Sequence, residues 1–170
     1  MSTYELDLDI AGLGIVFYSP FAVAHIAEEE DFLSAHFMNP GDVAQYVNAC
    51  TISAIGTGTS GEFQIRLYEG APPSDPDLES AAVIRLGLEV RDTKICFRDL
   101  YDLMEWTAVC PEEQTISWPD GFYLITVVSY VPPSGYLGED QVIEMYFEPV
   151  AERPKLVWPG VPDISSLLGG

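Results

Sequence analysis

Apolar residues recur with a period of two in at least four separate segments of this 170-residue chain. The segments are 5–10, 62–68, 82–91 and 142–148. Because successive side chains of a strand point to opposite faces, each pattern predicts a half-buried β-strand. The apolar residues expected to build the core are Phe63, Ile65, Leu67, Ile84, Leu86, Leu88, Leu124, Ile143, Met145 and Phe147.

Two turns are predicted to join neighbouring strands into hairpins. Asp92-Thr93 divides two alternating runs, which favours a hairpin there. Pro119-Asp120-Gly121 separates 115–118 from the apolar run 122–131 and gives a stronger hairpin signal. The segment 99–106 is the one convincing helix candidate. Many short strands with one short helix predict an all-β fold, an antiparallel β-sandwich, with a closed barrel as the alternative.

The length of the chain is typical of one domain. We expect a single acidic β-sandwich domain over residues 1–150. A proline-rich tail should follow at 151–170 and either pack on the domain or extend from it, because its prolines disfavour regular structure. The acidic run 28–31 and the residues up to Gly41 are expected to form a long exposed loop.

Cysteine usage and the N-terminus indicate the compartment. Cys50, Cys96 and Cys110 are an odd number without CxxC spacing, so we expect free thiols and neither a disulfide framework nor a zinc site. The N-terminus lacks the positive charge and the apolar run of a secretory signal. The most apolar stretch, 14–27, is too short to span a membrane. The sequence therefore predicts a soluble, cytoplasmic protein.

Acidic residues outnumber basic residues by 27 to 7, which gives a net charge of -20. No Lys or Arg occurs before Arg66. Such a chain repels phosphates, so nucleic-acid binding is disfavoured, whereas a basic protein or a metal ion is attracted. A surface adapted only for solubility, for example in a salty cytoplasm, is the other explanation.

Two groups of residues carry the ligand types that metal ions use. One surrounds the acidic run: His25, Glu28, Glu29, Glu30, Asp31 and His36. The other is an oxygen-rich loop: Asp75, Asp77 and Glu79. Neither group has the spacing of a known metal motif, so no metal or cofactor is assigned. A hydrolase whose groups assemble only in three dimensions, with Cys50 and His25 as one available pair, is a further alternative, but no catalytic residue is predicted.

Several segments between residues 14 and 148 follow one another in an order that points to a family. They are 17–23 (FYSPFAV), Ile52-Ser53, 62–67 (EFQIRL), the predicted hairpin at 83–97 and 118–124 (WPDGFYL). This order resembles the bacterial competence protein J family, whose known member inhibits a DNA-entry nuclease. The resemblance implies an intracellular β-sandwich that inhibits a nuclease or another toxin. The family's Asp-Trp segment after the second strand is replaced here by the run 28–31, and no functional residue is carried over.

These observations favour a non-enzymatic acidic protein that binds and neutralises a basic protein, with a nuclease or toxin as the first candidate. The predicted partner-binding residues are Glu28, Glu29, Glu30 and Asp31, whose carboxylates would occupy phosphate positions on the partner. Aromatic anchors are expected among Trp106, Trp118, Trp158, Tyr123, Tyr130, Tyr136 and Tyr146. The alternatives are a calcium- or transition-metal-dependent binding module and the hydrolase.

Overall fold

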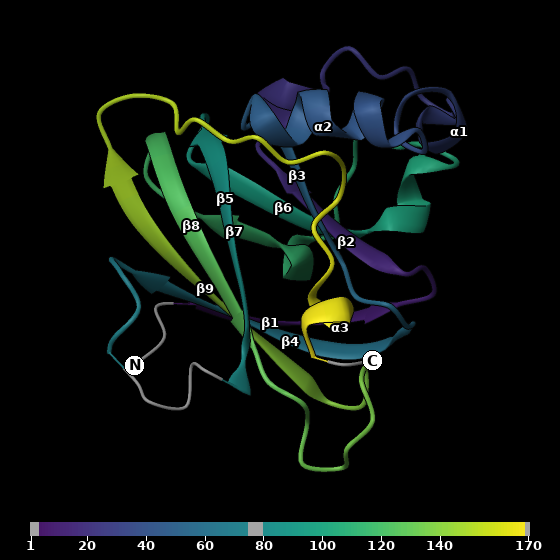
Figure 1. Ribbon diagram of the computed structural model, residues 1–170. Coiled ribbons are helices and arrows are strands. Elements are labelled where there is room, and N and C mark those ends of the chain that lie inside the picture. The colour runs from purple at the N-terminus through teal and green to yellow at the C-terminus, as the bar shows by residue number, and fades with distance from the viewer. Residues whose placement is uncertain (1–3, 75–79, 169–170) are drawn as a thin grey trace.

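Strands in two open sheets form the framework of the protein. The computed structural model describes residues 4–74 and 80–168, and neither sheet in this part of the chain closes into a barrel (Figure 1). The five-stranded sheet has the order β1 (Tyr4–Ile10), β4 (Gly61–Glu69), β9 (Gln141–Val150), β8 (Gly121–Ser129) and β5 (Ala82–Val90). The four-stranded sheet has the order β3 (Ile52–Gly56), β2 (Gly14–Tyr18), β6 (Lys94–Asp99) and β7 (Thr115–Ser117).

Both predicted hairpins are wrong, because each turn carries the chain from one sheet to the other. β5 and β6 belong to different sheets, and so do β7 and β8. The turn at Asp92-Thr93 is nevertheless present, and both residues have positive φ, 61° and 53°, as tight turns often require. The two turns bond to each other, since Asp120 Oδ1 accepts from the Thr93 amide at 2.8 Å and the Trp118 amide donates to the Thr93 carbonyl at 3.1 Å. A reversal signal in the sequence does not say which strand the returning chain will pair with.

The five-stranded sheet is mixed, which corrects the antiparallel prediction. β4 and β9 run parallel, with Ile65 opposite Ile143 and Leu67 opposite Met145. All other pairs are antiparallel. β4 and β9 are far apart in the chain, so no local turn dictates their relative direction.

The predicted core residues are buried, with one exception. Leu124 on β8 is half-buried, whereas its neighbours Tyr123 and Ile125 are buried. The run 122–131 is apolar on both faces, so its pattern did not identify the face that points to the core. Buried residues of both sheets form one hydrophobic cluster, in which Phe17 of β2 stacks on Phe97 of β6 with ring centroids 5.3 Å apart.

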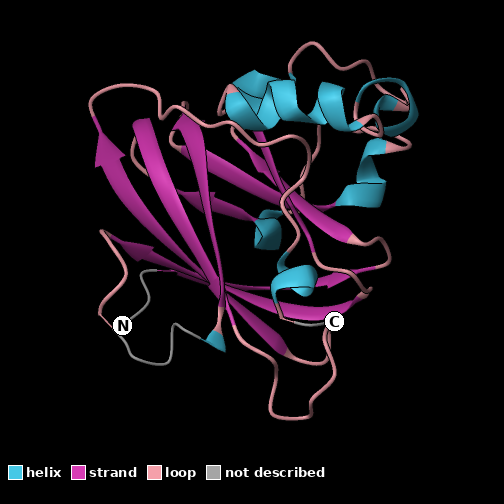
Figure 2. Cartoon of the chain, in the orientation of Figure 1, coloured by secondary structure: helices cyan, strands magenta, loops and turns pink. Residues whose placement is uncertain are grey.

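Helices are more numerous than the one predicted, although all are short (Figure 2). The α-helices are α1 (Phe32–His36), α2 (Pro40–Asn48) and α3 (Ile164–Leu167). The described residues also contain the 3₁₀ turns η1 (Pro20–Val23), η3 (Leu100–Leu103) and η4 (Glu112–Gln114). The predicted helix at 99–106 is the 3₁₀ turn η3, with Asp99 as its N-cap as expected. The predicted exposed loop contains α1, in which Phe32 and Leu33 are buried. The helix was not predicted because five residues are too few to show helical periodicity.

The outer face of the four-stranded sheet is covered by irregular chain. Every residue of β2 is buried, so β2 has neighbours on both sides of its sheet. On the outer side, the Tyr18 ring lies 5.8 Å from the Trp106 ring of the segment that follows η3. This covering segment, residues 104–111, positions the acidic run described below.

The C-terminal segment contacts the rest of the chain at several points. The Trp158 amide donates to Asn48 Oδ1, the Asn48 side-chain amide donates to the Trp158 carbonyl, and Trp158 Nε1 donates to the Arg85 carbonyl, all within 2.8–2.9 Å. α3 lies in this segment despite the surrounding prolines. Cys50, Cys96 and Cys110 are free thiols. None of the helices in the described residues is long and apolar enough to cross a membrane.

Replacing Phe97 by Ala should lower the free energy of unfolding by about 3–5 kcal/mol, because the side chain is fully buried against Phe17. Val83 is an exposed residue of β5, so Val83→Ala is the control and should change stability by about 0.5 kcal/mol or less. Urea unfolding followed by circular dichroism measures both. Equal losses for the two variants would contradict the assignment of the core.

Candidate functional site

The acidic run forms a tight turn between η1 and α1. The Glu30 amide donates to the Ala27 carbonyl at 3.1 Å, and Glu29 has φ of 68°. A positive φ at the third residue of a turn is a glycine or asparagine position, so glutamate there is unusual. Such a backbone outlier is a feature from which a functional hypothesis can start.

Three of the four carboxylates accept hydrogen bonds from backbone amides. Glu28 accepts from Ala108 at 2.8 Å, Glu30 accepts from Ala27 at 3.2 Å, and Asp31 accepts from Ser34 at 3.0 Å as the N-cap of α1. The Ser34 amide holds the pKa of the Asp31 carboxyl below its usual value. Among the described residues, no hydrogen bond is recorded for the Glu29 carboxylate. The Glu29 carboxylate is therefore the one in the run that contributes least to holding the conformation of the turn.

The backbone of the turn is paired with Trp106 in both directions. The Glu29 amide donates to the Trp106 carbonyl at 2.7 Å, and the Trp106 amide donates to the Glu30 carbonyl at 3.0 Å. Together with the Glu28–Ala108 bond, this two-way bridge fixes the acidic turn on the covering segment. The loop is exposed but its conformation is defined by backbone hydrogen bonds.

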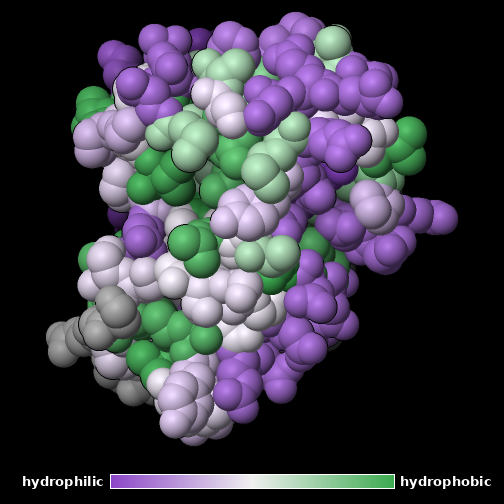
Figure 3. All heavy atoms as spheres, turned by 90° about the vertical axis from the view of Figure 1, so that its right-hand side faces the viewer, coloured by the Kyte–Doolittle hydropathy of each residue, from purple (hydrophilic) through white to green (hydrophobic). Residues whose placement is uncertain are grey.

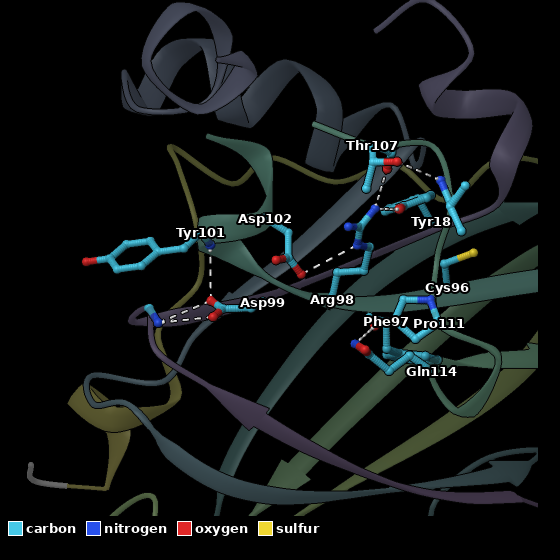
Figure 4. A network of polar contacts seen from close by, with 12 residues as sticks. Tyr18, Cys96, Phe97, Arg98, Asp99, Tyr101, Asp102, Thr107, Pro111 and Gln114 are labelled. Atoms are coloured by element: carbon cyan, nitrogen blue, oxygen red, sulfur yellow. Dashed lines mark hydrogen bonds and ion pairs between the residues drawn. The ribbon is translucent and has the colours of Figure 1, made fainter. Parts of the chain in front are cut away.

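A buried arginine holds the covering segment on the sheet (Figure 4). Arg98 of β6 is 4% exposed, and its Nη1 donates to the Thr107 carbonyl at 2.7 Å and to the Tyr18 hydroxyl at 3.4 Å. Its Nε lies 3.5 Å from Asp102 Oδ2, and its guanidinium carbon lies 4.9 Å from the Trp106 ring centroid. Burial raises the pKa of Tyr18, so its hydroxyl stays protonated and neutral beside the guanidinium.

Asp99 fixes η3, which leads into the covering segment. Its carboxylate accepts from the amides of Ala11, Gly12 and Tyr101 at 2.8–3.3 Å, which joins the turn after β1 to η3 (Figure 4). A Cβ on Gly12 would lie 2.6 Å from Asp99 Oδ1, so this close approach requires glycine.

Exposed apolar side chains flank the acidic turn. Met38 lies just after α1, and Met104 and Val109 lie in the covering segment; they are 66%, 43% and 75% exposed. Figure 3 views the molecule from the side on which α1 lies in Figure 1, and apolar groups interrupt the hydrophilic surface there. Sequence reasoning did not single out these residues, because isolated Met and Val in polar surroundings give no periodic signal.

A second acidic surface lies over β1 and β4. It borders a cavity of about 600 Å³ whose acidic lining residues are Asp7, Asp9, Glu62 and Asp140, with Arg66 as the base among them. A hydrogen bond with Asp140, supported by the negative charges of Asp140, Asp9 and Asp7, raises the pKa of the Glu62 carboxyl. The turn 28–31 is therefore not the only concentration of negative charge on the protein.

The alternative chemistries gain no support from the described residues. No group of three or more His, Cys, Asp and Glu side chains in the described part of the chain is arranged to hold a metal ion. His25 stacks on Tyr46, and His36 packs against Phe32. Burial raises the pKa of the Cys50 thiol to about 11, which is opposite to what a nucleophile needs. Asp75, Asp77 and Glu79 lie outside the described residues.

The predicted aromatic anchors are mostly structural. Four of them, Trp106, Trp118, Tyr123 and Tyr146, are buried, and Trp158 and Tyr130 are half-buried. Tyr136 is the one that is widely exposed. The apolar part of a binding surface beside the acidic turn is therefore aliphatic and thioether in character, with Trp106 beneath it.

The fold is similar to that of two solved structures, although no family model and no curated sequence matches this chain. One is the protein described as crocagin biosynthetic gene J, with a TM-score of 0.51 and 11% identity, covering 90% of this chain and 100% of that chain. Another is ComJ from Bacillus subtilis, an inhibitor of the DNA-degrading activity of NucA, with a TM-score of 0.49 and 10% identity, covering 88% and 98%. A member of the family that the sequence resembles is therefore among the structural neighbours.

The stability contributed by Asp31 should depend on pH. Because its pKa is lowered in the folded state, the contribution is present above the ordinary carboxyl pKa and is lost as pH falls through the lowered value. Between about pH 4 and pH 3, the free energy of unfolding of the wild type should therefore fall more steeply than that of Asp31→Asn. Urea unfolding across this range tests the expectation, and parallel curves would show that the cap does not act through its charge.

Replacing Arg98 by Met should loosen the acidic turn without touching it. The Thr107 carbonyl loses its donor, which costs about 1–3 kcal/mol of stability. Amide hydrogen exchange at Glu29 and Trp106 should accelerate by at least tenfold, since the covering segment is no longer held on β6. Arg85→Met, which changes the exposed side chain of Arg85, is the control. Unchanged exchange at Glu29 in the Arg98 variant would disprove the coupling.

Proposed function

We propose that this chain is a non-enzymatic cytoplasmic protein, built on a β-sandwich, that binds and neutralises a basic protein of the nuclease or toxin class. The observation that carries the proposal is the acidic turn at Glu28–Asp31, which is exposed, held by backbone bonds to Trp106, and strained at Glu29. A loop that is already ordered loses little conformational entropy on binding, so its contacts are retained as affinity.

The composition of the surface around the turn supports protein recognition. Carboxylates steer the approach of a cationic partner, and exposed Met38, Met104 and Val109 supply apolar area that a partner can bury. A surface adapted only for solubility has no need of apolar side chains beside its acids. The combination favours an interface.

Few of the acids are neutralised within the protein. Arg66, Arg91 and Arg98 each lie beside a carboxylate, at Glu5, Glu89 and Asp102. With 27 acids and 7 bases, most carboxylates face solvent or one another. The resulting field attracts a basic surface over roughly the Debye length of 8 Å at physiological salt and repels nucleic acid.

A nuclease suits this field because it must present positive charge where it holds phosphates. The mechanism we propose is occlusion: the carboxylates of the turn occupy phosphate positions, and the neighbouring apolar side chains exclude water from the contact. The sequence resemblance to the competence protein J family points to the same class of partner.

Glu29→Gln should slow association with the partner three- to tenfold at low salt and leave folding unchanged. Glu29 is the appropriate site because Glu28, Glu30 and Asp31 also hold backbone amides. The control is Glu152→Gln, which removes the same charge from an exposed position shortly after β9. The end of β9 lies on the opposite side of the view from α1 (Figure 1).

The partner is first captured from a lysate of the source organism at low and high salt, and association is then measured with the purified proteins by surface plasmon resonance. A captured nuclease should also lose its DNA-degrading activity in the presence of this protein. Glu29→Gly should slow association as Glu29→Gln does and lose no stability, because glycine adopts the positive φ without strain. Equal association rates for the wild type, Glu29→Gln and Glu152→Gln would retire the proposal for this turn.

A further inference from the structure

Two of the three cysteines touch each other across the covered face of the four-stranded sheet. Cys96 lies on β6, and Cys110 lies at the end of the covering segment, just before η4. A side-chain hydrogen bond joins the two thiols. Cys96 pairs in register with Thr115 of β7, whose hydroxyl lies 4.0 Å from Cys96 Sγ and donates to the Pro111 carbonyl at 3.1 Å. Thr115 therefore keeps the two cysteine-bearing segments together.

The two thiols differ in access to solvent. Cys96 is buried, whereas Cys110 is half-buried and lies beside the exposed Val109. A small reagent therefore reaches the Cys110 thiol more readily than the Cys96 thiol. An accessible attacking thiol with a second thiol in contact is the arrangement found in redox-responsive cysteine pairs.

We propose that Cys96 and Cys110 form a reversible dithiol–disulfide pair that is oxidised by a low-molecular-weight disulfide. The Cys110 thiolate attacks one sulfur of the oxidant, forms a mixed disulfide and releases the first thiolate. Cys96 then loses its proton and attacks Cys110 Sγ, which forms the Cys96–Cys110 bond and releases the second thiolate. The pair is oxidised by two electrons, the oxidant is reduced to two thiols, and the two cysteine protons end on these leaving groups.

The surroundings of the pair fit this order of attack. The hydrogen bond from Cys96, assisted by Thr115 and the nearby charge of Arg98, lowers the pKa of the Cys110 thiol to about 7. The same hydrogen bond, together with burial, raises the pKa of Cys96. At neutral pH a substantial share of Cys110 is therefore thiolate, the reactive form, while Cys96 stays protonated until the mixed disulfide removes the charge beside it.

Cys50 is the matched control. It is buried, its thiol points at the carbonyls of Asn48 and Pro154, and burial raises its pKa to about 11. It has no cysteine partner among the described residues and should not react.

Oxidation would lock the covering segment onto β6. The same segment carries Trp106 and Ala108, which bond to the turn at Glu28–Glu30, so the new bond would remove opening motions of that turn. Closing a loop of this length is expected to raise Tm by on the order of 5–10 °C. This inference concerns the fold and does not depend on the proposed partner.

The test exposes the reduced full-length protein to glutathione disulfide, alkylates the remaining thiols, and maps the products by peptide mass spectrometry. The wild type and Cys50→Ser should give the Cys96–Cys110 cross-linked peptide, lose two alkylatable thiols, and recover them with dithiothreitol. Cys96→Ser, or Cys96→Ala if the serine variant fails to fold, should stop at the mixed disulfide on Cys110. Cys110→Ser should remain unmodified at Cys96.

Two results would overturn the proposal. One is a wild-type protein that accumulates glutathione on Cys110 and never forms the cross-link, which would show that the thiols cannot reach bonding geometry. The other is a wild-type protein in which Cys96 and Cys110 react with glutathione disulfide no faster than Cys50 does, which would show that the pair is inert. An oxidised protein with an unchanged Tm would overturn the locking of the covering segment.

Discussion

The contacts of Arg98 hold together parts of the protein that the sheets alone would leave apart. A guanidinium on the outer face of β6 is removed from water, which is unfavourable unless its donors are satisfied and its charge is balanced. The Thr107 carbonyl and the Tyr18 hydroxyl accept hydrogen bonds from Nη1. The Asp102 carboxylate balances the charge and the face of Trp106 covers the guanidinium, while Nε has no hydrogen-bond partner among the described residues. The segment from η3 to Cys110 must therefore lie against the sheet. Its backbone then offers Trp106 and Ala108 to the acidic turn, so the shape of the exposed loop is set from beneath.

The sequence predicted the positions of the strands better than it predicted which strands pair with each other. Alternation in β1, β4, β5 and β9 identified both the strands and the residues that face the core, because β1, β4 and the first halves of β5 and β9 bury only one face. It failed at Leu124, where both faces of β8 are apolar. Pairing was predicted from turn residues at 92–93 and 119–121, and the turns are present, but the choice between closing a hairpin and crossing to the other sheet depends on long-range packing.

The candidate site shows the same division. A run of four acids is visible in the sequence, but the capping role of Asp31 was not predicted, because the residues of α1 were expected to form a loop. The positive φ of Glu29 and the bridge to Trp106 depend on a segment more than seventy residues away, and no local pattern announces them. The same holds for the contact between Cys96 and Cys110, which the odd number and wide spacing of the cysteines concealed. The acids of β1 and β4 were read as the polar face of half-buried strands, yet in the fold they border a cavity.

The place of β9 in its sheet governs the order in which the protein can assemble. β9 is the last strand of the chain, but it lies between β4 and β8, in the middle of the five-stranded sheet. Until it is inserted, β1 with β4 and β8 with β5 are two separate ribbons, each with an open edge where β9 belongs. Pairing over such a large sequence separation is slow, and an unpaired edge invites association with other chains. During synthesis, β9 must leave the ribosome before these edges close. The polar residues that alternate along β1 and β4, most of them acidic in β1, interrupt these apolar strands in the way that gatekeeper residues limit aggregation.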